Sequence, residues 1–229
     1  KQYILASSAS IYGQQDQIAT ETSPVKPITA YSKANRNAEV DVLKLHDKNF
    51  CVSVFRFSSL YGISPRMRFD MSVNEMVLDL FKNKKIVVRG KNNQRPFLHV
   101  QDAVDAYKLI INADKEKIGG EIFNVGIEKQ NYAIGDLAKN ITNSINIDSQ
   151  LEFGDNNDHR SYAASFEKIR DILNYNPSRT LEQGSLEIYN SLKSGQISDS
   201  IETITLKWYQ HIQSDPELLK KHSINGKFL

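Results

Sequence analysis

The sequence has little of several features that mark particular classes of protein. Its 229 residues include one cysteine, Cys51, so no internal disulfide can form, which is typical of a reducing compartment. No apolar stretch approaches the roughly 20 residues of a membrane-spanning helix, and no signal peptide is recognisable. The formal net charge is only +2, which argues against nucleic-acid binding driven by bulk charge. We therefore expect a cytoplasmic protein without nucleic-acid or membrane partners.

Two further absences concern metals and cofactors. The five histidines and the single cysteine show no metal-site spacing, so we expect no metal. None of the 11 glycines forms G-x-G-x-x-G or G-x-x-G-x-x-G, the turn that holds a dinucleotide pyrophosphate. Cys51 lies in an alternating apolar run, and we interpret it as a core thiol rather than a catalytic one.

What the chain does contain is an alternation of strand-like and helix-like segments. Apolar periodicity predicts strands at 3–6, 51–57, 86–88, 97–100 and 121–125. It predicts helices at 31–46, 134–145, 166–173, 181–192 and 201–212, with two more that begin near Asp70, as a cap, and Asp102. This alternation predicts an α/β fold with a sheet covered by helices, and the helix-rich later part looks like a smaller appended region.

A group of hydroxyl side chains follows the first predicted strand. Residues 7–13 read Ser-Ser-Ala-Ser-Ile-Tyr-Gly, and Tyr31 begins the next predicted helix. A strand end projects a hydroxyl into a cleft, and a helix start can bring a phenol to the same point. Ser8 would then orient a substrate hydroxyl while Tyr31 takes or gives its proton. Taken alone, the serines could instead form a turn, and Tyr31 could be an ordinary aromatic at a helix start.

Further segments follow in a set order. Residues 56–62 read Arg-Phe-Ser-Ser-Leu-Tyr-Gly, residues 90–102 contain Arg-Pro-Phe-Leu-His-Val, residues 123–126 read Phe-Asn-Val-Gly, and residues 158–162 read Asp-His-Arg-Ser-Tyr. Asn74 lies near a helix start after Arg66 and Arg68. Together with residues 7–13 and Tyr31, this order resembles the extended short-chain dehydrogenase/reductase family, and in particular its NAD-dependent nucleotide-sugar epimerases and dehydratases. The resemblance covers nearly the whole chain.

The resemblance implies roles for individual residues. Ser8 and Tyr31 match the family's catalytic hydroxyl and catalytic tyrosine. Four residues match positions that bind the nucleotide sugar: Ser59, Asn74, Arg95 and Arg160. Two arginines suit a diphosphate because the guanidinium fork matches phosphate oxygens. For each arginine, the plainer alternative is a surface ion pair.

One position departs from the family. In the motif Tyr-x-x-x-Lys, the lysine binds the nicotinamide ribose and lowers the pKa of the tyrosine, since a nearby positive charge lowers a pKa by roughly 1–3. Here Asn35 occupies that position, and it can bind a ribose hydroxyl but supplies no charge. Lys33 lies about 200° around the helix from Tyr31, whereas Asn35 lies about 40° away. Lys33 therefore takes the lysine's role only if the helix starts later than predicted, and we keep Tyr31, Asn35 and Lys33 as cofactor-binding candidates.

The resemblance also implies the architecture. We expect a Rossmann-like parallel sheet whose N-terminal part is missing, because the chain opens at Lys1 in strand-like sequence and the family's glycine turn lies upstream of this strand. Residues 1–62 should form the C-terminal part of an NAD-binding domain, with later strands near 97–126 returning to it. Residues 63–229 should form mainly a substrate-binding α/β region. The chain as given is expected to be inactive alone.

The implied function is that of an NAD-dependent nucleotide-sugar epimerase in carbohydrate biosynthesis, with NADP as an open alternative cofactor. Ala9 and Ser10 stand where the family's 4,6-dehydratases carry an acidic residue, which favours an epimerase over a dehydratase. Reductase and decarboxylase activities stay open. Asn35 and the missing glycine turn support a different alternative, a non-catalytic relative that binds a nucleotide sugar or a partner protein. The sugar, the base and the stereochemistry are not indicated.

A homodimer is also expected. Related enzymes pair through the helix that follows the catalytic tyrosine, and here Ala34, Ala38, Val42 and Leu45 form an apolar stripe along that helix. The plainer alternative is that this stripe faces the chain's own sheet.

Overall fold

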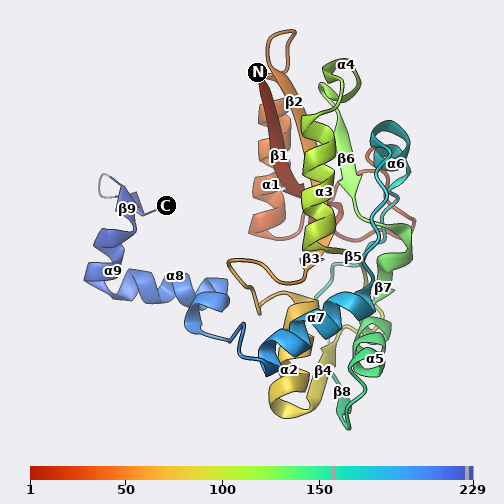
Figure 1. Ribbon diagram of the computed structural model, residues 1–229. Helices are drawn as coiled ribbons and strands as arrows, with labels where there is room; N and C mark the ends of the chain where they lie inside the picture. The colour runs from red at the N-terminus through yellow and green to blue at the C-terminus, as the bar shows by residue number, and fades with distance from the viewer. Residues whose placement is uncertain (156–157, 225–226, 229) are drawn as a thin grey trace.

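The computed structural model describes residues 1–155, 158–224 and 227–228 (Figure 1). Its strands are β1 (Gln2–Ser8), β2 (Cys51–Phe57), β3 (Ser59–Tyr61), β4 (Lys85–Arg89), β5 (Gln94–His99), β6 (Ile122–Val125), β7 (Asn131–Ala133), β8 (Gln150–Gly154), β9 (Ser223–Ile224) and β10 (Lys227–Phe228). Its α-helices are α1 (Ala30–Leu43), α2 (Ser72–Asn83), α3 (Val100–Ile111), α4 (Lys115–Ile118), α5 (Ile134–Ile145), α6 (Glu167–Leu173), α7 (Leu181–Lys193), α8 (Thr205–Ser214) and α9 (Pro216–Lys221). Short 3-10 helices are η1 (Ala9–Tyr12), η2 (Glu128–Gln130) and η3 (Ile201–Thr203).

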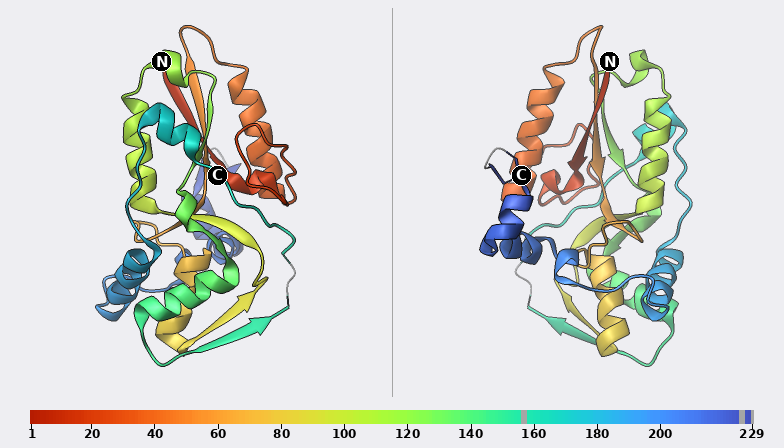
Figure 2. Two further views of the ribbon diagram at one scale, coloured as in Figure 1. Left: turned by 90° about the vertical axis from the view of Figure 1, so that its right-hand side faces the viewer. Right: turned by 60° about the vertical axis from the view of Figure 1, so that its left-hand side comes forward.

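Strands β1, β2 and β6 form a parallel sheet in that order. Every residue of β2 is buried, as expected for a central strand of a parallel sheet that is covered on both faces. Figure 2 shows α1 against one face of the sheet and α3 with α6 against the other. Apolar side chains of α3 and α6 pack there on Phe55 and Phe123, and Cys51 belongs to the same cluster, which confirms it as a core thiol.

A second group of elements lies beyond the carboxyl ends of this sheet (Figure 1). Strand β3 pairs in parallel with β5, β5 pairs antiparallel with β7, and β4 pairs in parallel with β8. Helices α2, α5 and α7 contact one another. They enclose a separate hydrophobic cluster that includes Val77, Leu80, Ile86, Val88 and Leu137. The space between the two groups of elements is where the site lies.

Two local predictions were wrong. The segment predicted as one helix at 201–212 breaks at Ile204, because Ser200 and Thr203 hydrogen-bond to each other and close the short turn η3 before α8 begins. Asp70 does not cap α2. Its carboxylate instead pairs with Arg68 and accepts the backbone N–H of Thr205 at 3.1 Å, which ties the loop before α2 to the start of α8.

Helices α8 and α9 project away from the body of the molecule (Figure 1). Of the helices in residues 1–155, 158–224 and 227–228, none combines the length and apolar character that a bilayer crossing requires.

Candidate active site

Ser8 ends strand β1 at the carboxyl edge of the sheet. Its hydroxyl donates a hydrogen bond to the hydroxyl of Ser10 at 3.0 Å and accepts one from the Ser10 backbone N–H at 3.2 Å. These bonds cap η1, which turns the chain away from the sheet directly after the strand. At the end of the same turn, Gly13 adopts φ +67° and leaves no room for a Cβ beside the carbonyl oxygen of Lys26. The Ser8 hydroxyl is therefore held by local geometry at the strand end.

Tyr31 lies in the first turn of α1. Thr29 caps this helix by accepting the backbone N–H of Ser32 at 3.1 Å, and the Ser32 hydroxyl accepts the Thr29 N–H in return at 3.0 Å. Such a capping box fixes the residue at which a helix begins. The Tyr31 side chain is 62% exposed and lines the same cavity as Ser8.

The register of α1 bears on Lys33 and Asn35. Both residues lie inside the helix, which starts at Ala30, so the helix does not begin late enough to exchange their positions. The side-chain amide of Asn35 donates to the carbonyl oxygen of Tyr31 at 2.9 Å, one turn earlier. Lys33 is exposed, and neither side chain lines the cavity. The structure thus keeps the predicted register of α1, and the cofactor roles of both residues stay predictions.

The apolar stripe of α1 does not pack against the chain's own sheet throughout. The helix ends at Leu43, and Leu45 lies beyond it with 59% exposure. Ala34 is exposed, and Ala38 and Val42 are only half-buried. The buried residues of the helix are instead polar, Ser32 and Glu39. The stripe is open to a partner, and the homodimer stays a prediction.

Arg95 and Arg160 meet at a shared carboxylate, that of Asp158. Arg95 Nη2 lies 3.1 Å from Asp158 Oδ2, and Arg160 donates to the same carboxylate through Nε at 2.9 Å and Nη2 at 2.7 Å. Arg95 also donates to the carbonyl oxygens of Gln94 and Arg160. The structure therefore brings together two arginines that are 65 positions apart in the chain.

Burial and charge set the electrostatics around this cluster. Partial burial raises the pKa of Asp158, but hydrogen bonds from Arg160 and the charge of Arg95 outweigh it and lower the pKa to about 2. Arg95 lies 5.1 Å from the centre of the Tyr162 ring, a cation–π distance. Burial raises the pKa of Tyr162 to about 12, although both arginines act in the opposite direction. Near neutral pH the cluster holds two cations and one anion.

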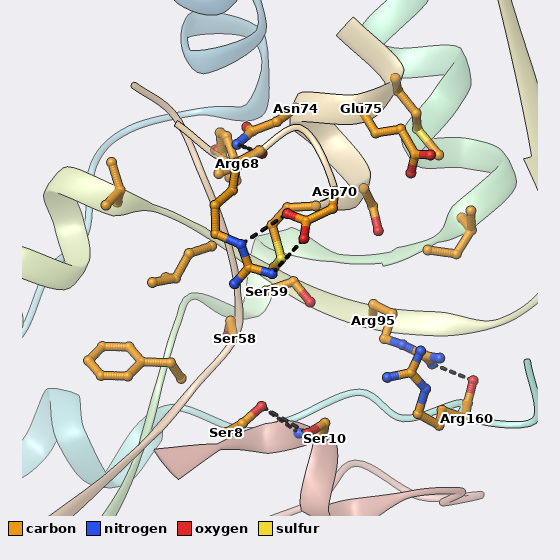
Figure 3. Close-up of a pocket in the computed structure, with 18 of the residues that line it drawn as sticks. Ser8, Ser10, Ser58, Ser59, Arg68, Asp70, Asn74, Glu75, Arg95 and Arg160 are labelled. Atoms are coloured by element: carbon orange, nitrogen blue, oxygen red, sulfur yellow. Dashed lines mark hydrogen bonds and ion pairs between the residues drawn. The ribbon is translucent and has the colours of Figure 1, made fainter. Parts of the chain in front are cut away.

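A single cavity of about 890 Å³ connects these groups. Figure 3 shows Ser8 and Ser10 on one side of it, Arg95 and Arg160 on another, and Asn74 and Glu75 of α2 across from the serines. Its lining includes Ser7, Ser8, Ser10, Tyr31, Ser58, Ser59, Arg66, Arg68, Asn74, Arg95, Asp158, Arg160 and Tyr162. A volume of several hundred Å³ is typical of a site for a small organic ligand.

The remaining predicted substrate residues, Ser59 and Asn74, lie on β3 and α2. Ser59 lines the cavity. Asn74 is 4% exposed, and its amide accepts the backbone N–H of Gly62 at 3.1 Å and donates to the carbonyl oxygen of Arg68 at 2.9 Å. In this structure Asn74 therefore shapes the loop at 62–68. Arg68 pairs with Asp70 at the cavity wall.

Several cavity residues were not predicted from the sequence. Tyr162 lies beneath Arg95, and Glu75, Asp79 and Arg89 line the part of the cavity between α2 and β4. A signal for Arg89 was present, because residues of β4 alternate between buried and outward positions and Arg89 falls on the outward set. Asp158 was noted only as part of a motif, because its contact with Arg95 spans 63 positions.

The residues at the carboxyl ends of β1 and β2 fit one end of a dinucleotide. Ser8 and Ser59 line the cavity there, together with Tyr31 from the start of α1, and they present hydroxyl groups that suit a nicotinamide ribose. The fit is partial, because a pyrophosphate needs a glycine-rich turn and the sequence contains none. Among the residues that the structure describes, no three or more His, Cys, Asp and Glu side chains are grouped to hold a metal ion.

Comparison with known sequences gives a consistent result. The sequence profile of the NAD dependent epimerase/dehydratase family matches residues 1–126. An uncharacterised UDP-glucose epimerase of Bacillus subtilis is 22% identical, over 80% of this chain and 57% of its own length. A UDP-N-acetyl-alpha-D-glucosaminuronate decarboxylase of Bacillus cytotoxicus is 24% identical, over 94% of this chain and 65% of its own. The chain thus spans less than two thirds of the length of these relatives.

Solved structures share the fold. The UDP-glucuronic acid 4-epimerase from Bacillus cereus, in complex with UDP-glucuronic acid and NAD, has a TM-score of 0.73 at 21% identity, over 84% of this chain and 62% of that one. The dTDP-glucose 4,6-dehydratase from Bacillus anthracis, in complex with NAD, has a TM-score of 0.71 at 24% identity, over 84% and 62%. The predicted Rossmann-like α/β fold is confirmed. Since the matching profile covers more than half of its residues, the chain belongs to the NAD dependent epimerase/dehydratase family.

Proposed function

We propose that this chain is the catalytic and substrate-binding part of an NAD-dependent epimerase that acts on a nucleoside-diphosphate sugar. The observation that carries the proposal is the single cavity that Ser8 and Tyr31 share with Arg95 and Arg160. Proton-transfer groups at one side and a pair of arginines at another match a substrate that has a reacting hydroxyl and a diphosphate.

The proposed roles follow from where each side chain lies. The Ser8 hydroxyl, which is fixed by Ser10, orients the reacting sugar hydroxyl. Tyr31 takes the proton of that hydroxyl and returns it in the reverse step. Arg95 and Arg160 bind the diphosphate, whose oxygens then compete with the Asp158 carboxylate for the same donors. Ser59 and Asn74 complete the substrate wall.

When bound, NAD supplies the hydride acceptor and donor for the sugar carbon. We assign its nicotinamide end to the hydroxyl-bearing residues at the ends of β1 and β2 and to the start of α1, where Tyr31 and Asn35 lie one turn apart. In the Bacillus cereus epimerase structure, NAD and UDP-glucuronic acid are bound together, which supports this pairing of ligands by analogy of fold.

Epimerisation is favoured over dehydration by the residues beside Ser8. Ala9 is fully buried and has no acid–base group, and Ser10 is engaged with Ser8. Elimination across the sugar needs an additional acid and base. Neither residue offers one, so the proposed reaction ends with hydride return to the same carbon.

A second function is favoured by one observation. Asn35 replaces the lysine and is used in a bond to the Tyr31 carbonyl oxygen, so this position supplies no cation beside the phenol. A non-catalytic protein that binds a nucleotide sugar would tolerate this loss.

The test is turnover by the full-length natural protein on a panel of nucleotide sugars with NAD, with products identified by NMR. An epimerised product that is lost in Tyr31→Phe, while nucleotide-sugar binding persists, supports the proposal. Tyr3→Phe is the matched control, because Tyr3 is 43% exposed and lies outside the cavity. Binding without turnover on any substrate would favour the non-catalytic alternative, and normal turnover by Tyr31→Phe would refute the assigned base.

A further inference from the structure

One arm of the cavity takes no part in the chemistry proposed above. It is lined by residues of α2, β4 and the start of α5, namely Glu75, Asp79, Val87, Arg89 and Ile134, and we call it the nucleoside arm. Figure 3 shows Glu75 near the top of the cavity and Ser8 near the bottom. Arg95 and Arg160 lie at the right, at a level between the two. If the reacting sugar lies at Ser8 and the diphosphate lies at the arginines, the remaining part of the substrate that can occupy this arm is the nucleoside.

The sequence builds the two walls of the arm by simple periodicity. Glu75 and Asp79 are four residues apart on α2, so they lie on one flank of the helix while its apolar residues enter the core. On β4, Ile86 and Val88 point into the core and their neighbours point outward. The outward residues, Val87 and Arg89, reach the cavity. The arm thus presents two carboxylates and one guanidinium around an apolar patch.

These charged groups have unused hydrogen-bonding capacity. Within the part of the chain that the structure describes, the side chains of Glu75 and Arg89 make no hydrogen bond or ion pair, and Asp79 accepts only a long bond of 3.5 Å from Asn83. Partial burial and the neighbouring Asp79 raise the pKa of Glu75, while Arg89 acts in the opposite direction. Arg89 lines the same cavity as both carboxylates, yet it is bound to neither.

We infer that the nucleoside arm recognises guanine, so that the substrate is a GDP-sugar. This inference rests on the proposed function. Guanine carries two adjacent donors, N1–H and the N2 amino group, which a carboxylate such as that of Glu75 can accept together. Its O6 and N7 are adjacent acceptors, and the forked guanidinium of arginine is their best-matched partner. The arm supplies both kinds of group.

The other bases match this arm less well. Uracil and thymine have one N–H between two carbonyl oxygens, so a carboxylate that approaches the N–H also faces an oxygen. Cytosine and adenine offer one amino group beside an acceptor nitrogen. The uridine and thymidine nucleotides named for the solved structures belong to proteins that are 21% and 24% identical to this chain and share its fold. The inference that guanine is recognised rests on the residues that line this chain's own nucleoside arm.

The test is calorimetric titration of the full-length natural protein with GDP and, separately, with UDP. We expect GDP to bind about tenfold more tightly or better, since a bidentate base contact discriminates by this order. UDP binding equal to or tighter than GDP binding would overturn the guanine inference and leave the proposed function standing. If neither nucleotide binds, the proposed function falls and the guanine inference falls with it.

Two variants connect the preference to the arm. Glu75→Gln and Arg89→Met should each weaken GDP binding about tenfold and bring the GDP-to-UDP affinity ratio toward one, with UDP binding little changed. Because both side chains are exposed and unpaired, the fold should survive, and circular dichroism checks this. Glu217→Gln, on α9 and outside the cavity, is the matched control. A preference for GDP that persists in both variants would show that residues other than Glu75 and Arg89 recognise the base.

Discussion

The carboxylate of Glu39 accepts hydrogen bonds from Nε and Nη2 of Arg56, at 3.0 and 2.8 Å, with both side chains almost completely withdrawn from water. The same carboxylate accepts the hydroxyl of Ser7 at 2.6 Å, and Arg56 also donates to the hydroxyl of Tyr12 at 2.9 Å. Helix α1, which begins beside Tyr31, is thereby joined to β1, which ends in Ser8. The buried ion pair orients the two proposed catalytic elements with respect to each other.

Removing the charge of Glu39 should destabilise the protein strongly. Glu39→Gln leaves the guanidinium of Arg56 buried without its counter-ion, and we expect a loss of about 3 kcal/mol in the free energy of unfolding. Urea denaturation measures it. Asp41→Asn is the matched control, since Asp41 pairs with Lys44 on the solvent side of the same helix and should cost less than about 0.5 kcal/mol. A cost below about 1 kcal/mol for Glu39→Gln would contradict the proposed importance of the pair.

Restoring the family's lysine should change the pH dependence of turnover. In the full-length protein, Asn35→Lys places a cation one turn after Tyr31, on the side where Asn35 now contacts the Tyr31 backbone. We expect the wild-type rate to rise toward alkaline pH, and the variant's rise to occur at lower pH with a faster rate near neutrality. The added ammonium group would stabilise the phenolate by a nearby opposite charge. If the profile does not move and Lys33→Ala abolishes activity, Lys33 has the lysine's role.

Asp158 should contribute stability over a defined pH range. Its folded-state pKa of about 2 lies below the value near 3.9 of an unfolded aspartate, so the contribution is present above about pH 4 and is lost as the pH falls through about 2. Asp158→Asn should therefore lower Tm at pH 7, and the difference from wild type should shrink as the pH is lowered below 4. Asp136→Asn, which removes an exposed partner of Lys139, is the control. A difference in Tm that is independent of pH would contradict the assignment.

The exposed stripe of α1 should mediate self-association. Ala34→Glu introduces a charge on the outward side of the helix, and we expect it to convert a dimer into a monomer without loss of folding. Static light scattering at high micromolar concentration gives the mass. A wild-type protein that is monomeric at this concentration would contradict the predicted dimer.

The 229-residue chain alone should bind NAD weakly. It offers hydroxyl groups for the nicotinamide end, but no glycine-rich turn for the pyrophosphate. Calorimetric titration of the 229-residue chain with NAD should detect no tight one-to-one complex. Tight binding by the 229 residues would mean that other groups hold the pyrophosphate.

Local pattern predicted much of the fold. The strand at 51–57 and the helix at 134–145 have the predicted bounds, because apolar periodicity is strong in both. Short elements such as β3 and β7 were missed, since three residues carry too little periodicity to be recognised. Asp70 was wrongly predicted as a cap, because its carboxylate pairs with Arg68 and accepts the N–H of Thr205, which lies 135 positions away. Contacts of that separation leave no trace in local spacing.

The candidate site was likewise predicted only in part from the sequence. Ser8, Tyr31, Arg95 and Arg160 could be named because family motifs carry them, and the structure gathers all four at one cavity. The charges of the nucleoside arm belong to no motif. They become significant only when α2 and β4 are seen to face the same space.

The two ends of the cavity rest on separate hydrophobic clusters. Behind the nucleoside arm lie Val77, Leu80 and Ile86, whereas Ala9 and Tyr12 belong to a cluster at the end that carries Ser8. Substitutions in the arm therefore need not disturb packing around the reacting hydroxyl. Libraries confined to the flank of α2 and the outward face of β4 would therefore change the proposed nucleoside contacts while the residues around Ser8 keep their packing.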